Sequence, residues 1–251
     1  MKFPNPLLLL LLFVSCKKAN IDITLSKITA KTIAVDSLIE PSKAIDDIVA
    51  PYKEKLTADM EQVLTYTPKN LSKKDGELQS SIGNLLADLC YEMANPVFRK
   101  KTNELIDFTL FNYGGIRASI SKGNVKRKDA FNVMPFENEL VVVKISGDKM
   151  SELVDYFIDR KRAHPLSKNI ALSVGKDDSY DLKINGEPFD KSKSYSVLTT
   201  DYLQNGGDRM NFFKNPEELT VLDYKMRDAI IDYFVKVDTL KTSIDNRAIL
   251  K

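Results

Sequence analysis

Several features that point to common kinds of catalytic centre are scarce in this sequence. It has no tryptophan, two cysteines and one histidine, His164, among 251 residues. A centre with two metal ions needs several imidazoles and carboxylates that converge, so we predict no metal site and no cofactor in this chain. Because Pro165 follows His164 in a basic loop, we expect this histidine at the surface. We also find no Ser-His-Asp set, phosphate-cradling loop or Cys/His cluster.

An excess of charge of one sign is also missing. Lys and Arg total 37 and Asp and Glu total 35, which gives a net charge of +2. Such a chain has no strong field to attract nucleic acid or an anionic membrane surface, so we exclude a nucleic-acid polymer as its partner. A composition of 43% hydrophobic and 29% charged residues fits one globular domain with a sizeable core and an N-terminal extension.

The N-terminus has an apolar run, Leu7 to Val14, that is too short for a mature membrane span of about 20 residues. A run of this length suits the apolar region of an export signal. The segment FVSC, which ends at Cys16, resembles a bacterial lipobox, with Phe13 where leucine is usual. Ordinary signal cleavage and an unprocessed anchor are the alternatives to a lipoprotein.

The lipobox resemblance predicts a lipoprotein signal peptide over 1–15, lipidation of Cys16, a tether over 16–22 and one domain over 23–251. A lysine after the cysteine favours the outer membrane, on its periplasmic or its external face. We therefore expect an exported bacterial lipoprotein that meets the membrane through its lipid only. Cys90 is then the one remaining thiol, and its place in a helical apolar stripe predicts a core side chain.

Apolar periodicity indicates helices and strands that alternate irregularly, which is typical of an α+β fold with a mixed β-sheet and packed helices. We expect a strand pair over 21–36 and a helix after Ser42 that is kinked or divided at Pro51. The other expected strands are 105–112, 139–146, 170–174, 180–190 with a turn at Asn185–Gly186, and 194–203, and the other expected helices contain Cys90, Met150–Phe157 and Met226–Val237.

Three segments place unusual residues at the ends of these strands. FNYGGIR runs from a strand into Gly114 and Gly115; taken alone, it is typical of a surface turn with a solvated arginine. MPFENEL puts an aromatic ring on a rigid turn, and DYLQNGGDRM joins a tyrosine to a second glycine pair, Gly206 and Gly207. An arginine, two aromatic rings, an aspartate and several amides suit a ligand with a flat ring, hydroxyls and a phosphate.

The order of four segments, SIGNLLADL, NYGGIR, MPFENEL and DYLQNGGDRM, resembles the C-terminal domain of the 5′-nucleotidase family over roughly residues 40 to 240. The resemblance implies a substrate-recognition domain that binds a nucleotide or nucleoside-like molecule. The base would lie between Phe136 and Tyr202, and Asp208 would accept hydrogen bonds from ribose hydroxyls. Asn112 and Asn138 would face the base, Arg117 would hold phosphate or ribose oxygens, and the glycine pairs would let the backbone approach the ligand.

The sequence departs from the family pattern in three respects. Tyr113 stands where the family has a third glycine, and Arg209 follows the Gly-Gly-Asp in place of glycine. Lys73 and Lys74 replace arginines that precede the first motif, as point charges or as a solvated turn. The family's catalysis comes from a separate N-terminal domain with two metals, for which the described motifs offer no counterpart.

We therefore expect the nucleotide-recognition half of a 5′-nucleotidase-type phosphoester hydrolase. Divalent metals would sit only on a partner domain, and a separate metallophosphatase would supply them. The alternatives are a lipid-anchored module that binds nucleotides or nucleosides without chemistry, and an interaction domain whose pocket no longer binds a ligand.

Overall fold

The computed structural model describes residues 25–251. The predicted signal peptide (1–15), the tether (16–22) and Cys16 lie outside the described residues. The chain divides into two units, Met1–Ile48 and Val49–Lys251, and the second holds the sheets and the core. The predicted boundary at residue 23 therefore precedes the start of the compact unit.

One prediction for the N-terminal part is wrong, and one of the two alternatives in a second prediction is excluded. Residues 25–36 form no strand, so the described part of the expected strand pair over 21–36 is absent. Helix α1 (Lys43–Glu61) is one continuous helix with Pro51 inside it, so the alternative of two shorter helices is wrong. It has no buried residue, so water can reach the carbonyl that the missing proline N–H leaves free.

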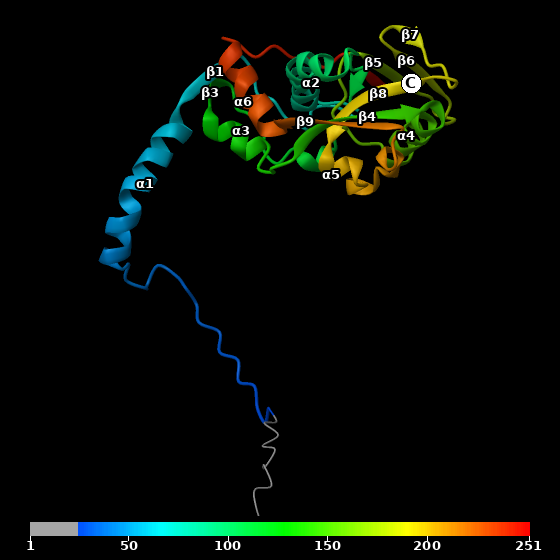
Figure 1. Ribbon diagram of the computed structural model, residues 1–251. Coiled ribbons are helices and arrows are strands. Elements are labelled where there is room, and N and C mark those ends of the chain that lie inside the picture. The colour runs from blue at the N-terminus through cyan, green and yellow to red at the C-terminus, as the bar shows by residue number, and fades with distance from the viewer. Residues whose placement is uncertain (1–24) are drawn as a thin grey trace, which may run out of the picture. The chain divides into compact units, whose positions relative to one another are not determined.

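A four-stranded mixed sheet organises the compact unit, as the sequence predicted (Figure 1). Its strand order is β2 (Phe108–Thr109), β8 (Ser194–Thr200), β4 (Glu139–Ser146) and β9 (Glu218–Lys225). β2 runs parallel to β8, whereas β4 is antiparallel to both of its neighbours. The predicted strand 139–146 is confirmed at both ends; the predicted strand 105–112 is reduced to two residues and a bridge at Leu110.

Both faces of the central sheet are covered. The four consecutive residues from Leu140 to Val143 are each at most 2% exposed, which requires packing on both sides of the strand. Helices α2 (Ser81–Thr102) and α6 (Met226–Lys236) pack together and contact β9, whereas α4 (Gly147–Arg160) and α5 (Asp201–Gln204) contact β4. Figure 1 shows α2 and α5 on opposite sides of the sheet.

The predicted helices that carry Cys90, Met150–Phe157 and Met226–Val237 are confirmed as α2, α4 and α6. Cys90 is fully buried, and this burial raises the pKa of its thiol, so the core role is confirmed and a nucleophilic role is unsuited to it. Ser80 caps α2 by accepting a hydrogen bond from the Gly83 amide.

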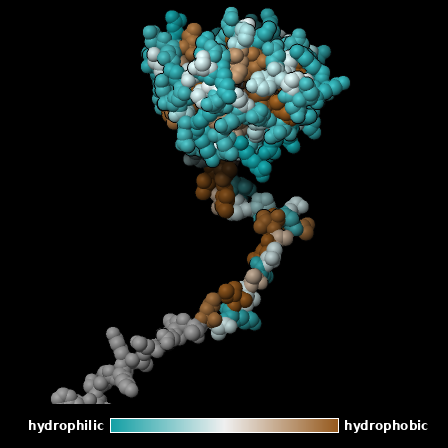
Figure 2. Space-filling model, turned by 90° about the vertical axis from the view of Figure 1, so that its right-hand side faces the viewer, coloured by the Kyte–Doolittle hydropathy of each residue, from teal (hydrophilic) through white to brown (hydrophobic). Residues whose placement is uncertain are grey.

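Two smaller sheets complete the unit. One has the order β10 (Ala248–Leu250), β5 (Ile170–Val174), β6 (Tyr180–Ile184) and β7 (Glu187–Pro188), and the other pairs β1 (Val63–Thr67) with β3 (Gly123–Lys126), ahead of helix α3 (Arg127–Val133). The predicted turn at Asn185–Gly186 is confirmed, with φ values of 53° and 86° that suit a two-residue hairpin loop. Figure 2 shows one face of this unit as mainly hydrophilic, in keeping with an interior core.

No helix within residues 25–251 is long and apolar enough to cross a bilayer.

The sheet register explains why distant segments meet. Phe108 pairs with Val197 in the parallel strand β8, so β2 and β8 end at the same edge of the sheet. Leu140 pairs with Thr200, so the antiparallel strand β4 begins at that edge. The segments after β2, before β4 and after β8 therefore converge, and these are the three segments that carry the predicted site.

Candidate functional site

The three segments enclose a pocket of about 280 Å³ at this edge of the sheet. All six predicted contact residues line it, together with the glycine pair of the first segment: Asn112, Gly114, Gly115, Arg117, Phe136, Asn138, Tyr202 and Asp208. The second pair, Gly206 and Gly207, lines an adjoining cavity of about 600 Å³ that shares Gly114, Tyr202 and Asp208 with the first.

A hydrogen bond joins two of these segments across the pocket. The Asn112 amide Nδ2, 96 residues away in sequence, donates to Asp208 Oδ2 over 2.8 Å. Asn112 is 9% exposed, so its side chain has few other positions available. A Cβ on Gly115 would lie 2.8 Å from Asn112 Oδ1, which is closer than real Cβ contacts allow. This glycine thus makes room for a side chain of the site itself, a use that the sequence analysis did not anticipate.

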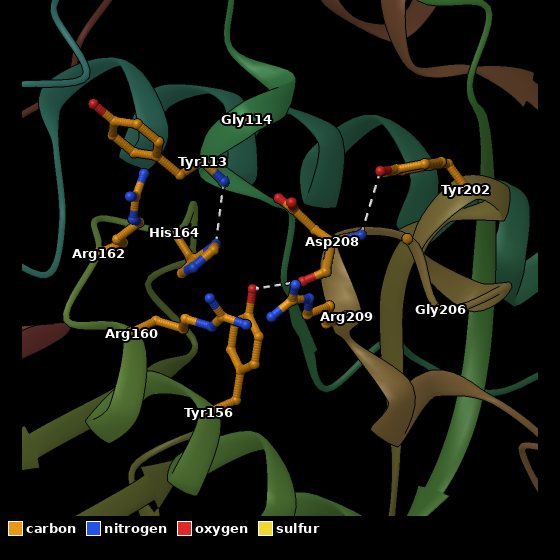
Figure 3. A pocket seen from close by; sticks show the side chains of 11 residues that line it. Tyr113, Gly114, Tyr156, Arg160, Arg162, His164, Tyr202, Gly206, Asp208 and Arg209 are labelled. Carbon is orange, nitrogen blue, oxygen red and sulfur yellow. Dashed lines mark hydrogen bonds between the residues drawn. The ribbon is translucent and has the colours of Figure 1, made fainter.

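The third segment surrounds Tyr202 in a similar way. A Cβ on Gly207 would lie 2.5 Å from the Tyr202 ring, and Gly206 has a φ of 86° that favours glycine. The Asp208 amide donates to the Tyr202 hydroxyl over 3.3 Å, as Figure 3 shows. Tyr202 is 49% exposed and lines both cavities.

Phe136 is held by an arginine that sequence reasoning missed. Arg227 is 7% exposed, donates to the Phe136 carbonyl over 3.3 Å and forms an ion pair with Glu137. Its guanidinium also lies 4.3 Å from the centre of the Phe131 ring. Because backbone and charge together fix this turn, Phe136 stays 39% exposed without collapsing onto the core. No sequence signal links Arg227 to a turn more than 90 residues earlier.

Arg117 lies at the mouth of the pocket. Its guanidinium carbon is 5.7 Å from the centre of the Phe136 ring, and Nη1 donates to the Gly114 carbonyl over 3.4 Å. It is exposed and has no carboxylate partner among residues 25–251, so most of its donors face solvent. Such a planar fork suits an anionic group at the pocket entrance.

The expected surface position of His164 is wrong. The side chain is 2% exposed, and Nδ1 accepts a hydrogen bond from the Tyr113 amide over 3.1 Å. Tyr156 and Phe157 pack on its ring, with centroids 5.2 and 5.4 Å away. Burial, reinforced by Arg162 and opposed by Asp208, lowers the pKa of His164 to about 4. The basic residues that precede it in sequence are exposed, and they led to the wrong prediction for the imidazole.

This burial predicts a pH-dependent stability. The folded pKa of about 4 lies below the unfolded value of 6.5, so the unfolded chain binds the proton more tightly. The contribution to the free energy of unfolding is therefore complete above pH 6.5 and is lost as pH falls toward 4, by on the order of 3 kcal/mol. Urea unfolding of wild type and His164→Asn at several pH values measures this loss of unfolding free energy. Asparagine keeps an acceptor for Tyr113 without titrating, and equal pH slopes in the two proteins would contradict the assignment.

The first motif, Gly83, Asn84 and Asp88, does not reach the pocket. Asn84 Nδ2 donates to Gln79 Oε1 and to the Ser243 carbonyl, over 2.8 and 2.9 Å. Asp88 accepts from Arg247. Residues 25–251 contain no group of three His, Cys, Asp or Glu side chains placed to hold a metal ion.

Comparisons with known proteins agree with this geometry. A family model for the 5′-nucleotidase C-terminal domain matches residues 61–215. Protein UshA of Escherichia coli is 36% identical over 109 residues, which cover 41% of this chain and 19% of that protein. A 5′-nucleotidase of Vibrio vulnificus is 24% identical over 188 residues, which cover 71% of this chain and 32% of that protein.

Solved structures share the fold. A 5′-nucleotidase precursor from Thermus thermophilus superposes with a TM-score of 0.67 at 19% identity, over 82% of this chain and 42% of that one. An NAD nucleotidase from Haemophilus influenzae gives a TM-score of 0.58 at 19% identity, over 84% of this chain and 41% of that one. This chain thus spans less than half the length of these relatives. Because the family match covers more than half of the sequence and includes all three site segments, the chain belongs to the 5′-nucleotidase C-terminal domain family.

Proposed function

We propose that this chain binds a nucleotide and supplies the recognition half of a 5′-nucleotidase-type phosphoester hydrolase. The observation that carries the proposal is the pocket of about 280 Å³ in which all six predicted contact residues meet. In this arrangement the base lies between the exposed faces of Phe136 and Tyr202. Asp208, fixed by Asn112, accepts hydrogen bonds from the ribose, and Arg117 meets an anionic oxygen at the mouth.

The chemistry of hydrolysis is assigned to a separate metallophosphatase. Metal-assisted hydrolysis needs ligands that hold the ions and activate water, and the one histidine of this sequence has its Nδ1 occupied by a backbone amide. The curated relatives are several times longer than the region they share with this chain. We propose that the partner corresponds to the part of such a relative that this chain does not cover.

A reconstitution assay tests this division of labour. The purified chain alone is expected to release no phosphate from AMP. A metallophosphatase without a recognition domain of its own should release phosphate when it is combined with the chain. The same mixture with Asp208→Asn, which removes the carboxylate but keeps the size, should lose most of the gain. Equal phosphate release with and without the chain would contradict the catalytic proposal.

The second candidate is a binding module without chemistry, and it rests on the same pocket. It predicts that adenosine and AMP bind the purified chain while no metallophosphatase gains activity from it. The two candidates are therefore separated by the reconstitution assay and not by binding. A reading frame beside this one that encodes a metallophosphatase without a recognition domain would favour the first.

We further propose that the protein is exported and anchored at the outer membrane through a lipid on Cys16. The lipobox-like FVSC segment and the lysine that follows it support this proposal. Fractionation of cells that express wild type or Cys16→Ser tests it, because the variant should leave the membrane fraction. A variant that stays with the membrane would count against lipidation.

A further inference from the structure

The cavity of about 600 Å³ beside the predicted nucleotide pocket has a wall that the proposed function does not use. Three arginines line it: Arg160 at the end of α4, Arg162 in the loop that follows, and Arg209 in the segment after β8. Figure 3 shows them around the same opening as His164 and Tyr156. None of the three has a carboxylate within ion-pair distance in the part of the chain that the structure describes.

Two of these guanidinium groups lie over aromatic rings. The Arg160 guanidinium carbon lies 5.5 Å from the centre of the Tyr156 ring, and that of Arg162 lies 5.7 Å from the centre of the Tyr113 ring. A cation–π contact of this kind does not use the N–H donors of a guanidinium in hydrogen bonds, so they stay available for a ligand. Tyr113, which replaces a family glycine, thus has a contact in this cavity.

Arg209 stands in a backbone conformation that favours glycine. Its φ is 64°, directly after Asp208 with a φ of 55°. A side chain other than glycine is strained in this region, because its Cβ approaches the backbone closely. The chain keeps an arginine in this conformation, and the Arg209 side chain lines the cavity together with Arg160 and Arg162.

Positive charge is poorly neutralised around this wall. Asp208 is the one carboxylate among the residues that line the cavity, and its Oδ2 already accepts from Asn112. Burial, followed by the charges of Arg117, Lys74 and Arg162, lowers the pKa of the Lys73 ammonium, which lies over the Tyr113 ring. A bound anion would relieve the repulsion among these groups.

We propose that the three arginines form a subsite for a phosphate on the 2′ or 3′ oxygen of the ribose, so that the preferred ligands are nucleosides phosphorylated on that edge. The assignment rests on the proposed function, in which Asp208 holds the ribose hydroxyls. Asp208 lies in the wall that the two cavities share. With the base between Phe136 and Tyr202, a group attached to those hydroxyls passes Asp208 into the larger cavity.

Calorimetric titration of the full chain with adenosine, adenosine 3′-phosphate and AMP tests the subsite. Adenosine 3′-phosphate should bind at least about 10-fold more tightly than adenosine, because charge-assisted hydrogen bonds to a phosphate are worth more than neutral ones. Arg160→Gln with Arg162→Gln should remove that preference. The pair Arg99→Gln and Lys100→Gln, which removes the same charge at the end of α2, should leave it unchanged.

Adenosine separates the failure of the subsite from the failure of the pocket. If adenosine binds but the 3′-phosphate adds no affinity, or if the added affinity survives in the Arg160/Arg162 variant, the subsite is wrong and the pocket stands. If the variant instead loses affinity for AMP alone, the arginines serve the 5′ group and the ribose-edge assignment is wrong. If none of the three ligands binds, the proposed function fails and the subsite fails with it.

Discussion

Replacing Arg247 by alanine is expected to lower the free energy of unfolding by about 3 kcal/mol, near the low end of the range of about 3 to 5 kcal/mol for one lost partner of a buried ion pair. Arg247 is 6% exposed. It donates to both carboxylate oxygens of Asp88 over 3.0 and 2.9 Å, to Asp245, and to the Leu166 carbonyl over 2.8 Å. The substitution leaves these acceptors without their donor, and chemical denaturation with a circular-dichroism readout measures the loss.

A matched control comes from an exposed ion pair. Lys236 and Glu92 lie 2.8 Å apart with side chains 55% and 49% exposed, so Lys236→Ala should cost less than about 1 kcal/mol. Arg247→Lys keeps the charge without the planar fork and should fall between the two. An Arg247→Ala protein as stable as Lys236→Ala would show that this contact does not hold the C-terminal segment to α2.

Removing the rings of Phe136 and Tyr202 is expected to weaken adenosine binding by about 1 to 3 kcal/mol for each ring, which is about 5-fold to 150-fold per substitution. Both rings are partly exposed in the free protein, so Phe136→Ala and Tyr202→Ala remove little packing within the core. Calorimetry on the two single variants and the double variant measures the effect, and unfolding curves confirm that each protein is folded.

Two controls separate stacking from other causes. Tyr202→Phe keeps the ring and loses the acceptor for the Asp208 amide, so it should retain most of the affinity. Tyr180→Ala removes a ring of similar exposure, 41%, from β6 outside the pocket, and should change nothing. Unchanged binding in the Phe136/Tyr202 double variant would overturn the placement of the base.

The local apolar pattern was sufficient to predict a strand where most residues of the segment are buried. The run 139–146 became β4 at its predicted bounds, because four consecutive buried residues form an unmistakable core strand. β9 was missed, since Leu222 is its one buried residue and the rest of the edge strand carries a mixed pattern. The alternation in 25–36 predicted strands, but a strand also needs a partner, and the described residues there have none.

The residues and motifs of the site could be predicted from the sequence. The contacts that hold these residues in place could not. Gly115 and Gly207 were assigned to ligand approach, whereas the structure shows them making room for Asn112 and Tyr202. Contacts across long sequence separations, such as Arg227 with the Phe136 carbonyl, leave no local signal. The burial of His164 was missed for a different reason: the basic residues just before it are exposed, whereas Tyr156 and Phe157, which precede these residues in α4, cover its ring.

A crystal structure of the full chain with AMP would show where the base and the ribose bind. We expect the adenine ring between Phe136 and Tyr202, with a ribose hydroxyl within hydrogen-bond distance of Asp208. A nucleotide bound elsewhere on the protein, or these two rings closed against each other with the ligand excluded, would contradict this placement.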